Sequence, residues 1–289
     1  MSPSHSAHRS EVSEESSPRE GPIGVFDSGV GGLSVMREIA KKLPHEDVIY
    51  FADTANCPYG SRSLEEIRGL TQAIVSFLLA HHCKIIVVAC NTASAAALHH
   101  LRGRFQVPIV GMEPAVKPAA QETETRVVGV IATQATFQGE LFASLIQRFA
   151  TDVTLLEGVC PGLVEQVEAG KLDDPQAEAI LRHCLEPMLE NGIDALTLGC
   201  THYPFLIPTI KKIAGPQVKI IDPSPAVARQ TKRVLEREGL LNLAHRRGRY
   251  TFYTTGNPET FATLQKGLTN LPGETKGVHW GKDNSIMTL

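Results

Sequence analysis

The stretches IIVVACNT (85 to 92) and ALTLGCTH (195 to 202) decide the fold that we expect for this chain. In each stretch, an apolar run of mostly β-branched or small residues ends at a cysteine that polar residues follow. Such a run is typical of a strand buried in a parallel sheet, and ligands bind beyond the carboxyl ends of such strands. Both thiols, Cys90 and Cys200, are therefore predicted to lie at the edge of the sheet where ligands bind and react.

The two stretches belong to an internal duplication of the chain. Four pairs of segments correspond in the same order: IGVFDS (23 to 28) with VGVIAT (128 to 133), Cys57-Pro58 with Cys160-Pro161, Cys90 with Cys200, and VPIVGMEPAV (107 to 116) with VKIIDPSPAV (218 to 227). Ordered correspondences at similar spacing indicate a repeated unit. Two related units that face each other would bring both thiols to one cleft.

Strand-like runs alternate with helix-like runs through both halves. Strands are predicted at 23 to 27, 48 to 52, 85 to 89, 107 to 111, 127 to 132, 153 to 156, 194 to 199 and 218 to 222. The run Leu64 to His81 carries apolar residues at the spacing of one helix face. This alternation predicts an α/β protein of two pseudo-symmetric parallel-sheet domains that face each other across a cleft.

The ends of the chain complete the predicted domains. Residues 1 to 21 have the composition of a disordered tail. After residue 228 we predict a basic amphipathic helix (Arg229 to Glu238), a strand at 249 to 256 and a final short helix, which together add an edge to the first sheet. The first domain is thus expected to comprise residues 22 to 116 plus 225 to 289, and the second residues 117 to 224.

Composition excludes several classes of function. The chain has 289 residues, 42% of them apolar and 20% charged, with a net charge of −3, so it lacks the basic surplus that binding to nucleic acid requires. It has no apolar run long enough for a membrane span, and its first twenty residues lack the apolar segment of a signal peptide. We expect a cytoplasmic protein without a nucleic-acid or membrane partner. A homodimer is compatible with the sequence, which does not fix the oligomeric state.

The six cysteines are expected to be free thiols, because the predicted compartment is reducing. None has the C-x-x-C spacing of a zinc or redox site, so no metal is expected. Cys57 and Cys160 each precede a proline in a loop with nothing nearby to activate a thiol. We interpret both as bystanders.

The segment DSGVGGLSV (27 to 35) follows a strand and opens a helix. It is neither the G-x-G-x-x-G pattern nor a P-loop, which would need a lysine in place of Leu33. Glycines permit a tight turn, and free backbone N–H groups at a helix start attract anions. We therefore interpret it as a carboxylate-binding turn that carries Asp27 and Ser28.

Taken together, four blocks resemble those of the glutamate racemases, in the cofactor-independent aspartate/glutamate racemase superfamily. The blocks are IGVFDSGVGGLSV (23 to 35), ADTANCPYG (52 to 60), ACNTASA (89 to 95) and LGCTHYP (198 to 204). The resemblance covers residues 22 to 265 and implies two pseudo-symmetric α/β domains with L- or D-glutamate bound between them. It also implies an enzyme that needs no cofactor and supplies D-glutamate for peptidoglycan synthesis.

The resemblance assigns roles to individual residues. It implies that Cys200 acts on L-glutamate and Cys90 on D-glutamate, with Asp27 and Asp53 near Cys90, and Glu165 and His202 near Cys200. It implies substrate contacts at Asp27, Ser28, Pro58, Tyr59, Gly60, Asn91, Thr92, Thr133, Thr136, Thr201 and His202. The chain departs from the family pattern after Thr136, and the stretch that places Glu165 (159 to 170) contains few matching residues.

Two other functions fit parts of the sequence. An aspartate racemase would usually carry Thr-Glu after the second cysteine, where this chain has Thr201-His202, which favours glutamate. An amino-acid-binding protein without turnover would have no use for paired thiols. The chain also lacks the lysine-centred context and phosphate site of a pyridoxal enzyme.

Overall fold

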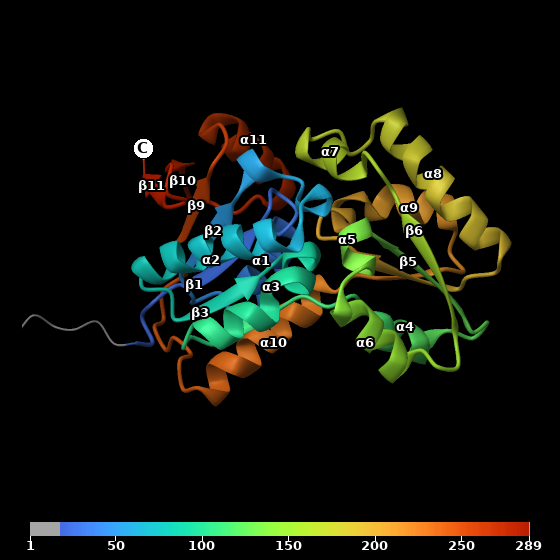
Figure 1. Cartoon of the computed structure of the whole chain (residues 1–289), viewed down its shortest axis with the longest axis horizontal. Helices are drawn as coiled ribbons and strands as arrows, with labels where there is room; N and C mark the ends of the chain where they lie inside the picture. The colour runs from blue at the N-terminus through green and yellow to red at the C-terminus, as the bar shows by residue number, and fades with distance from the viewer. Residues whose placement is uncertain (1–17, 289) are drawn as a thin grey trace, which may run out of the picture.

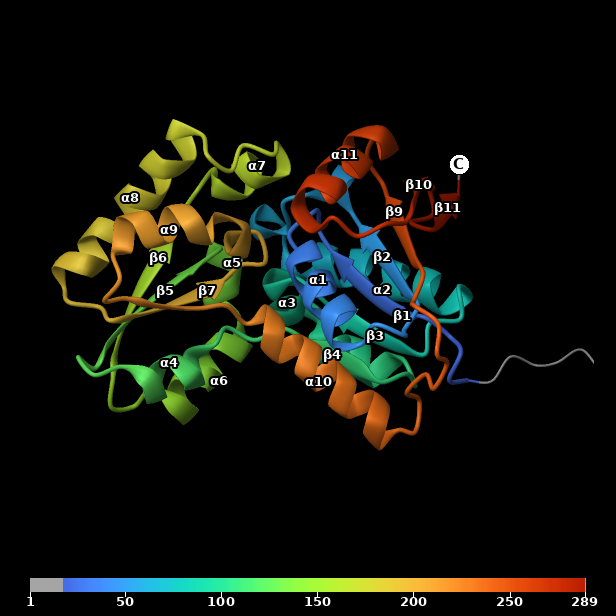
Figure 2. The ribbon, with the colours of Figure 1, turned by 180° about the vertical axis from the view of Figure 1, so that it is seen from behind.

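The computed structural model describes residues 18–288. Two sheets lie side by side, each flanked by helices (Figures 1 and 2). The first sheet has the strand order β11-β10-β9-β2-β1-β3-β4 and the second β6-β5-β7-β8. In the first, the strands are β1 (Ile23–Asp27), β2 (Val48–Ala52), β3 (Ile85–Val88), β4 (Ile109–Gly111), β9 (Tyr250–Thr254), β10 (Glu274–Trp280) and β11 (Ile286–Thr288). In the second, they are β5 (Val127–Ala132), β6 (Thr154–Val159), β7 (Ala195–Gly199) and β8 (Lys219–Ile221).

The order of the strands confirms the α/β fold of two related units. Four neighbouring strands of the first sheet, β2-β1-β3-β4, have the same order as β6-β5-β7-β8, which is the whole second sheet. All pairs within these two sets are parallel. Because β3 and β7 occupy equivalent positions, their carboxyl ends present equivalent residues. The duplication seen in the sequence is therefore a duplication of sheet topology.

Helices cover the faces of both sheets. Those of the first unit are α1 (Leu33–Lys42), α2 (Leu64–Ala80), α3 (Asn91–Arg104), α10 (Ser224–Arg237) and α11 (Pro258–Thr269), and those of the second are α4 (Val116–Glu122), α5 (Gln134–Phe137), α6 (Glu140–Phe149), α7 (Leu163–Glu168), α8 (Pro175–Glu190) and α9 (Ile207–Ala214). Helix α2 begins where the sequence predicts, because Ser63 and Glu66 form a capping box.

The chain crosses between the units twice, at equivalent places. After β4 it passes to α4, which packs on β5 and β7 of the second sheet, and after β8 it returns to α10, which packs on α1 and β4 (Figure 2). Strand β9 then pairs with β2, so the C-terminal segment extends the first sheet as expected. These contacts support a division into residues 22–116 plus 225–289 and residues 117–224, which we propose as the two domains.

The structure differs from the sequence-based expectation at three places. Strands β10 and β11 were not expected, and β11 pairs antiparallel with β10 at the edge of the first sheet. Cys160 and Cys184 form a disulfide, so the expectation of six free thiols is wrong for these two. Most of the expected tail lies outside the described residues, but the carbonyl of Arg19 accepts a hydrogen bond from Lys84 at 2.6 Å. No helix among residues 18–288 is both long and apolar enough to cross a membrane.

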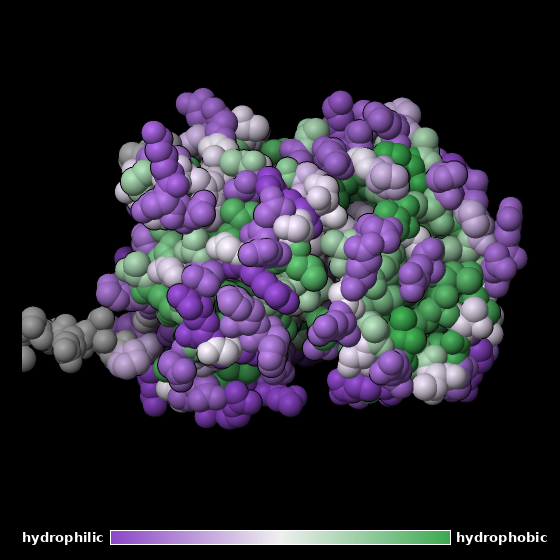
Figure 3. All heavy atoms as spheres, in the orientation of Figure 1, coloured by the Kyte–Doolittle hydropathy of each residue, from purple (hydrophilic) through white to green (hydrophobic). Residues whose placement is uncertain are grey.

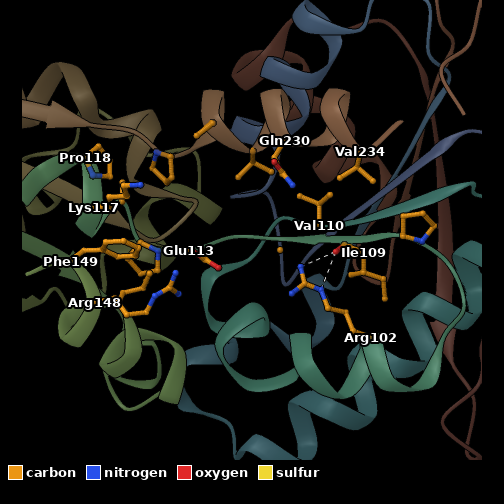
Figure 4. Close-up of a pocket in the computed structure, with 18 of the residues that line it drawn as sticks. Arg102, Ile109, Val110, Glu113, Lys117, Pro118, Arg148, Phe149, Gln230 and Val234 are labelled. Carbon is orange, nitrogen blue, oxygen red and sulfur yellow. Dashed lines mark hydrogen bonds between the residues drawn. The ribbon is translucent and has the colours of Figure 1, made fainter. Parts of the chain in front are cut away.

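A cavity of about 700 Å³ lies where the chain crosses between the units. Its lining includes Arg102, Glu113, Lys117, Arg148 and Gln230, from both units (Figure 4). Neither of the thiols that the sequence singles out lines it. The thiol site therefore lies elsewhere, between the strand ends of the two units.

Candidate active site

Both thiols lie at the carboxyl ends of equivalent strands. Cys90 follows β3 and caps helix α3, where the N–H of Ala93 donates to its Sγ at 3.4 Å. Cys200 directly follows β7. The two residues are only 5% and 6% exposed. They are close enough for a charge on Cys200 to affect the pKa of Cys90, so both belong to one site between the units, which meet along the furrow in Figure 3.

Asp27 accompanies Cys90. It ends β1, which pairs with β3, and it is completely buried. Its carboxylate accepts hydrogen bonds from the N–H of Gly29 at 2.7 Å and from the hydroxyl of Thr201, in the other unit, at 3.0 Å. Burial raises the pKa of Asp27. The charge of His202 and the hydrogen bonds from Gly29 and Thr201 lower it, but by less than burial raises it. Burial, followed by the charge of Asp27, also raises the pKa of Cys90. Cys90 therefore rests as a thiol beside an acid that retains a proton more readily than usual.

His202 accompanies Cys200. Its Nδ1 lies 3.6 Å from the Sγ of Cys200, and its Nε2 lies 2.6 Å from Oε1 of Glu168. Burial alone would lower the pKa of His202, but hydrogen bonds to the surrounding thiols and carboxylate raise it well above its ordinary value. Burial would raise the pKa of Glu168, yet its bonds to His202 and to the N–H of Val30 lower it. The pair is thus an imidazolium and a carboxylate, with the imidazolium against Cys200.

The carboxylate beside His202 is Glu168, not the expected Glu165. Both belong to α7, but Glu165 is exposed whereas Glu168 contacts His202. The two residues differ in their place on the helix. Glu168 lies one turn after the buried Val164, at the border of the apolar face, and Glu165 lies opposite that face. The family resemblance pointed to Glu165 because few residues match the family pattern in this stretch, and the two glutamates lie only three positions apart.

The glycine turn that follows β1 gives the second unit room to approach. A Cβ on Gly29 would overlap the carboxylate of Glu168, and a Cβ on Gly31 would overlap Nδ1 of His202. The N–H of Val30, between them, donates to Oε1 of Glu168 at 2.8 Å. The turn therefore does bind a carboxylate, and in this structure the carboxylate belongs to the protein itself. Its glycines serve close packing between the units.

Asp53 is completely buried and accepts several hydrogen bonds. Its oxygens accept hydrogen bonds from the Tyr59 hydroxyl at 2.7 Å, the Trp280 indole N–H at 2.8 Å and the Thr255 hydroxyl at 2.9 Å. The Asn56 amide donates to it as well, at 3.1 Å. Asp53 therefore orients the loop that carries Pro58, Tyr59 and Gly60. The role beside Cys90 that the resemblance implies for Asp53 stays a prediction.

Several expected substrate contacts meet across the two units. The hydroxyls of Thr92, in the first unit, and Thr133, in the second, lie 2.9 Å apart, and Thr136 lies 2.9 Å from Thr133. Both polar atoms of the Asn91 side chain are buried without a partner among the described residues. An unpaired buried amide is costly, so Asn91 fits a site that binds a polar ligand. Ser28, 4% exposed, lies beside Asp27.

The expected bystander Cys57 also lies in this site. Its Sγ is 3.6 Å from Oε1 of Glu168 and 3.9 Å from the hydroxyl of Ser28. Cys57, Glu168 and His202 have ligand atoms within 4.8 Å of one another. Because these residues come from three separate segments, their spacing in the sequence does not resemble a metal motif. Cys160, the counterpart of Cys57 in the second unit, forms the disulfide with Cys184 instead.

Comparison with known proteins identifies relatives along most of the chain. The family model for Asp/Glu/hydantoin racemases matches residues 23–231. A glutamate racemase from Roseiflexus sp. (strain RS-1) is 51% identical over 245 residues, which cover 84% of this chain and 90% of that protein.

Solved structures agree with the sequence relatives. The glutamate racemase isoform RacE1 from Bacillus anthracis superposes with a TM-score of 0.81 at 34% identity, over 90% of this chain and 98% of that one. The glutamate racemase from Francisella tularensis in complex with D-glutamate gives a TM-score of 0.79 at 32% identity, with the same coverage.

Proposed function

The chain belongs to the Asp/Glu/hydantoin racemase family, in which it is a glutamate racemase, and we propose that it inverts the Cα of glutamate with two thiols, Cys90 and Cys200. The observation that carries this proposal is the pair of buried thiols at equivalent strand ends of two related units. Inversion requires a base that removes a proton on one face of Cα and an acid that returns a proton on the other. A duplicated unit with one thiol in each half supplies both.

Each thiol has its own partner for the proton. We infer that His202, positioned by Glu168, stabilises the thiolate of Cys200, which removes the proton from L-glutamate. The 3.6 Å contact between Nδ1 and Sγ and the raised pKa of His202 support this role. On the other face, Cys90 as a thiol protonates the carbanion, and Asp27 beside it can return a proton to Cys90. In the D-to-L direction the roles of the two thiols exchange.

The substrate is held by polar groups that line the site. We propose that the unpaired amide of Asn91 binds a charged group of glutamate, since the carbanion-like transition state needs oriented donors on its carboxylate. The remaining contacts that we propose are Asp27, Ser28, Pro58, Tyr59, Gly60, Thr92, Thr133, Thr136, Thr201 and His202. The sequence Thr201-His202 after the second thiol and the names of the sequence relatives favour glutamate over aspartate.

We propose that the reaction needs no cofactor. The two thiols and their partners provide the acid and the base, so the proton transfers involve only groups of the chain itself. The product would serve peptidoglycan synthesis in the cytoplasm, as the family resemblance implies.

Racemisation in heavy water tests the assignment of one thiol to each face. The thiol that completes inversion has exchanged with solvent, whereas the abstracting thiol holds the substrate's own proton. At low conversion, the product should therefore carry one deuterium at Cα, and the recovered starting enantiomer should be nearly unlabelled. Chiral separation followed by mass spectrometry gives both values. Substrate labelled as fast as product would indicate a single base that serves both faces.

A further inference from the structure

Cys57 is a third thiol in the active site that the racemisation mechanism does not use. It belongs to the loop after β2 in the first unit, whereas Glu168 and His202 belong to the second. It is partly exposed, unlike Cys90 and Cys200. A ligand from solvent can therefore reach Cys57 and meet side chains of both units there.

The three side chains form a suitable triangle for a small cation. Zinc bound tetrahedrally at about 2.0 to 2.3 Å separates its ligand atoms by roughly 3.3 to 3.7 Å. The Sγ of Cys57 lies 3.6 Å from Oε1 of Glu168, and the three ligand atoms are all within 4.8 Å of one another. The 2.6 Å contact between Glu168 and His202 is shorter than this separation and would lengthen when an ion replaces the proton between them.

The chemistry of the donors selects the class of ion. A thiolate, an imidazole nitrogen and a carboxylate suit zinc and similar borderline-soft ions, whereas magnesium and calcium prefer oxygen ligands alone. Burial and the charge of Glu168 raise the pKa of Cys57 to about 11 in the free enzyme. The negative charge of Glu168, which disfavours the thiolate of Cys57, favours a bound cation. Binding of the cation would release the proton of the Cys57 thiol.

We propose that Cys57, Glu168 and His202 form an inhibitory binding site for Zn²⁺ or a cation of the same class. The three side chains supply one ligand each. A tetrahedral ion would take its fourth ligand from solvent, which reaches the partly exposed Cys57. Its inhibitory consequence rests on the proposed function of His202. With the ion on Nε2, the direct contact between His202 and Glu168 is lost, and the imidazole that lies 3.6 Å from Cys200 is held where the metal sets it. The displaced imidazole then supports the thiolate of Cys200 less well, and racemisation slows.

The test compares zinc inhibition in variants of the full-length, reduced enzyme. Chelator-treated wild type should be fully active, and buffered micromolar free Zn²⁺ should inhibit it reversibly, while Mg²⁺ should not. Cys57→Ser should retain basal activity within a few fold but require at least roughly 10-fold more zinc for half inhibition, because the loss of a ligand costs more than the roughly 10- to 100-fold loss that follows removal of a partner behind a ligand. Cys57→Ala should behave in the same way. Cys83→Ser is the matched control: it removes a free, buried thiol outside the site and should keep wild-type zinc sensitivity.

Cobalt provides a readout that does not depend on racemisation. Co²⁺ bound to a thiolate gives an intense near-ultraviolet charge-transfer band, which should form in wild type and in Cys83→Ser and be absent in Cys57→Ser. Equal zinc sensitivity of wild type and Cys57→Ser, or an unchanged cobalt band in that variant, would overturn the proposal and place the ion on another thiol. Wild type that neither binds Co²⁺ nor responds to Zn²⁺ would overturn it as well. An inactive enzyme that still forms the Cys57-dependent band would refute the proposed function and leave the metal site standing.

Discussion

Exchanging Glu168 for glutamine should weaken catalysis through His202. Glutamine retains an oxygen that can accept from the N–H of Val30 and from His202, so the exchange removes the charge and little else. The side chains of His202 and Glu168 are 3% and 20% exposed and meet at 2.6 Å, so solvent screens their interaction little. Charged hydrogen bonds are worth about 1.5 to 3 kcal/mol and neutral ones about 0.5 to 1.5, so the exchange should cost about 1 to 2 kcal/mol.

That loss converts into two measurable changes. If the transition state loses this stabilisation of about 1 to 2 kcal/mol in full, kcat/KM for glutamate falls about 5- to 30-fold. The fall should be equal in both directions, because enantiomers have equal free energies. The same loss lowers the pKa of His202, because the carboxylate that favours its protonated form is gone. Since the proton on His202 is then lost at lower pH, the alkaline limb of the kcat/KM profile should move to lower pH.

Glu165→Gln is the matched control, three residues away on the same helix. Glu165 is exposed and does not contact His202, so this variant should retain wild-type kcat/KM and the wild-type pH profile. Circular dichroism of the glutamate solution follows racemisation in both directions over the required pH range. Our reasoning fails if Glu165→Gln is the more damaged of the two, or if Glu168→Gln leaves both kcat/KM and the pH profile unchanged.

Further substitutions test other parts of the site. Cys57→Ala should keep the racemisation rate within a few fold of wild type, whereas Cys90→Ala or Cys200→Ala should lower it by several orders of magnitude. A severe defect in folded Cys57→Ala would show that the wrong thiols were chosen. His202→Asn should impair proton abstraction from L-glutamate more than from D-glutamate, which primary isotope effects with α-deuterated substrate in each direction would reveal; equal effects would remove His202 from its role. Gly31→Ala should abolish most activity and lower the free energy of unfolding in urea by about 1 to 3 kcal/mol, because its Cβ meets the buried His202. Gly69→Ala, whose Cβ meets no atom within 4 Å, should instead raise that free energy by up to about 1 kcal/mol and retain activity.

The sequence by itself determined the features that depend on local pattern. The runs that became β3 and β7 are continuously apolar because both faces of these strands are buried, and this burial is visible in the residues themselves. The ordered matches between halves predicted two related units, and in the structure these units share the strand order β2-β1-β3-β4 and β6-β5-β7-β8. The positions of Cys90 and Cys200 followed from those strands, since a residue just after a parallel strand lies at the functional edge.

Only the tertiary structure decided which distant side chains meet. Helix periodicity places Glu168, rather than Glu165, at the border of the buried face of α7, but only the packing of the second unit brings its carboxylate to His202. The disulfide between Cys160 and Cys184 and the triangle of Cys57, Glu168 and His202 join segments far apart in the chain. Local periodicity reports which face of an element is buried, but contacts between elements depend on how whole units pack. Cys57 therefore looked like a bystander in the sequence but lies beside Glu168 and His202 in space.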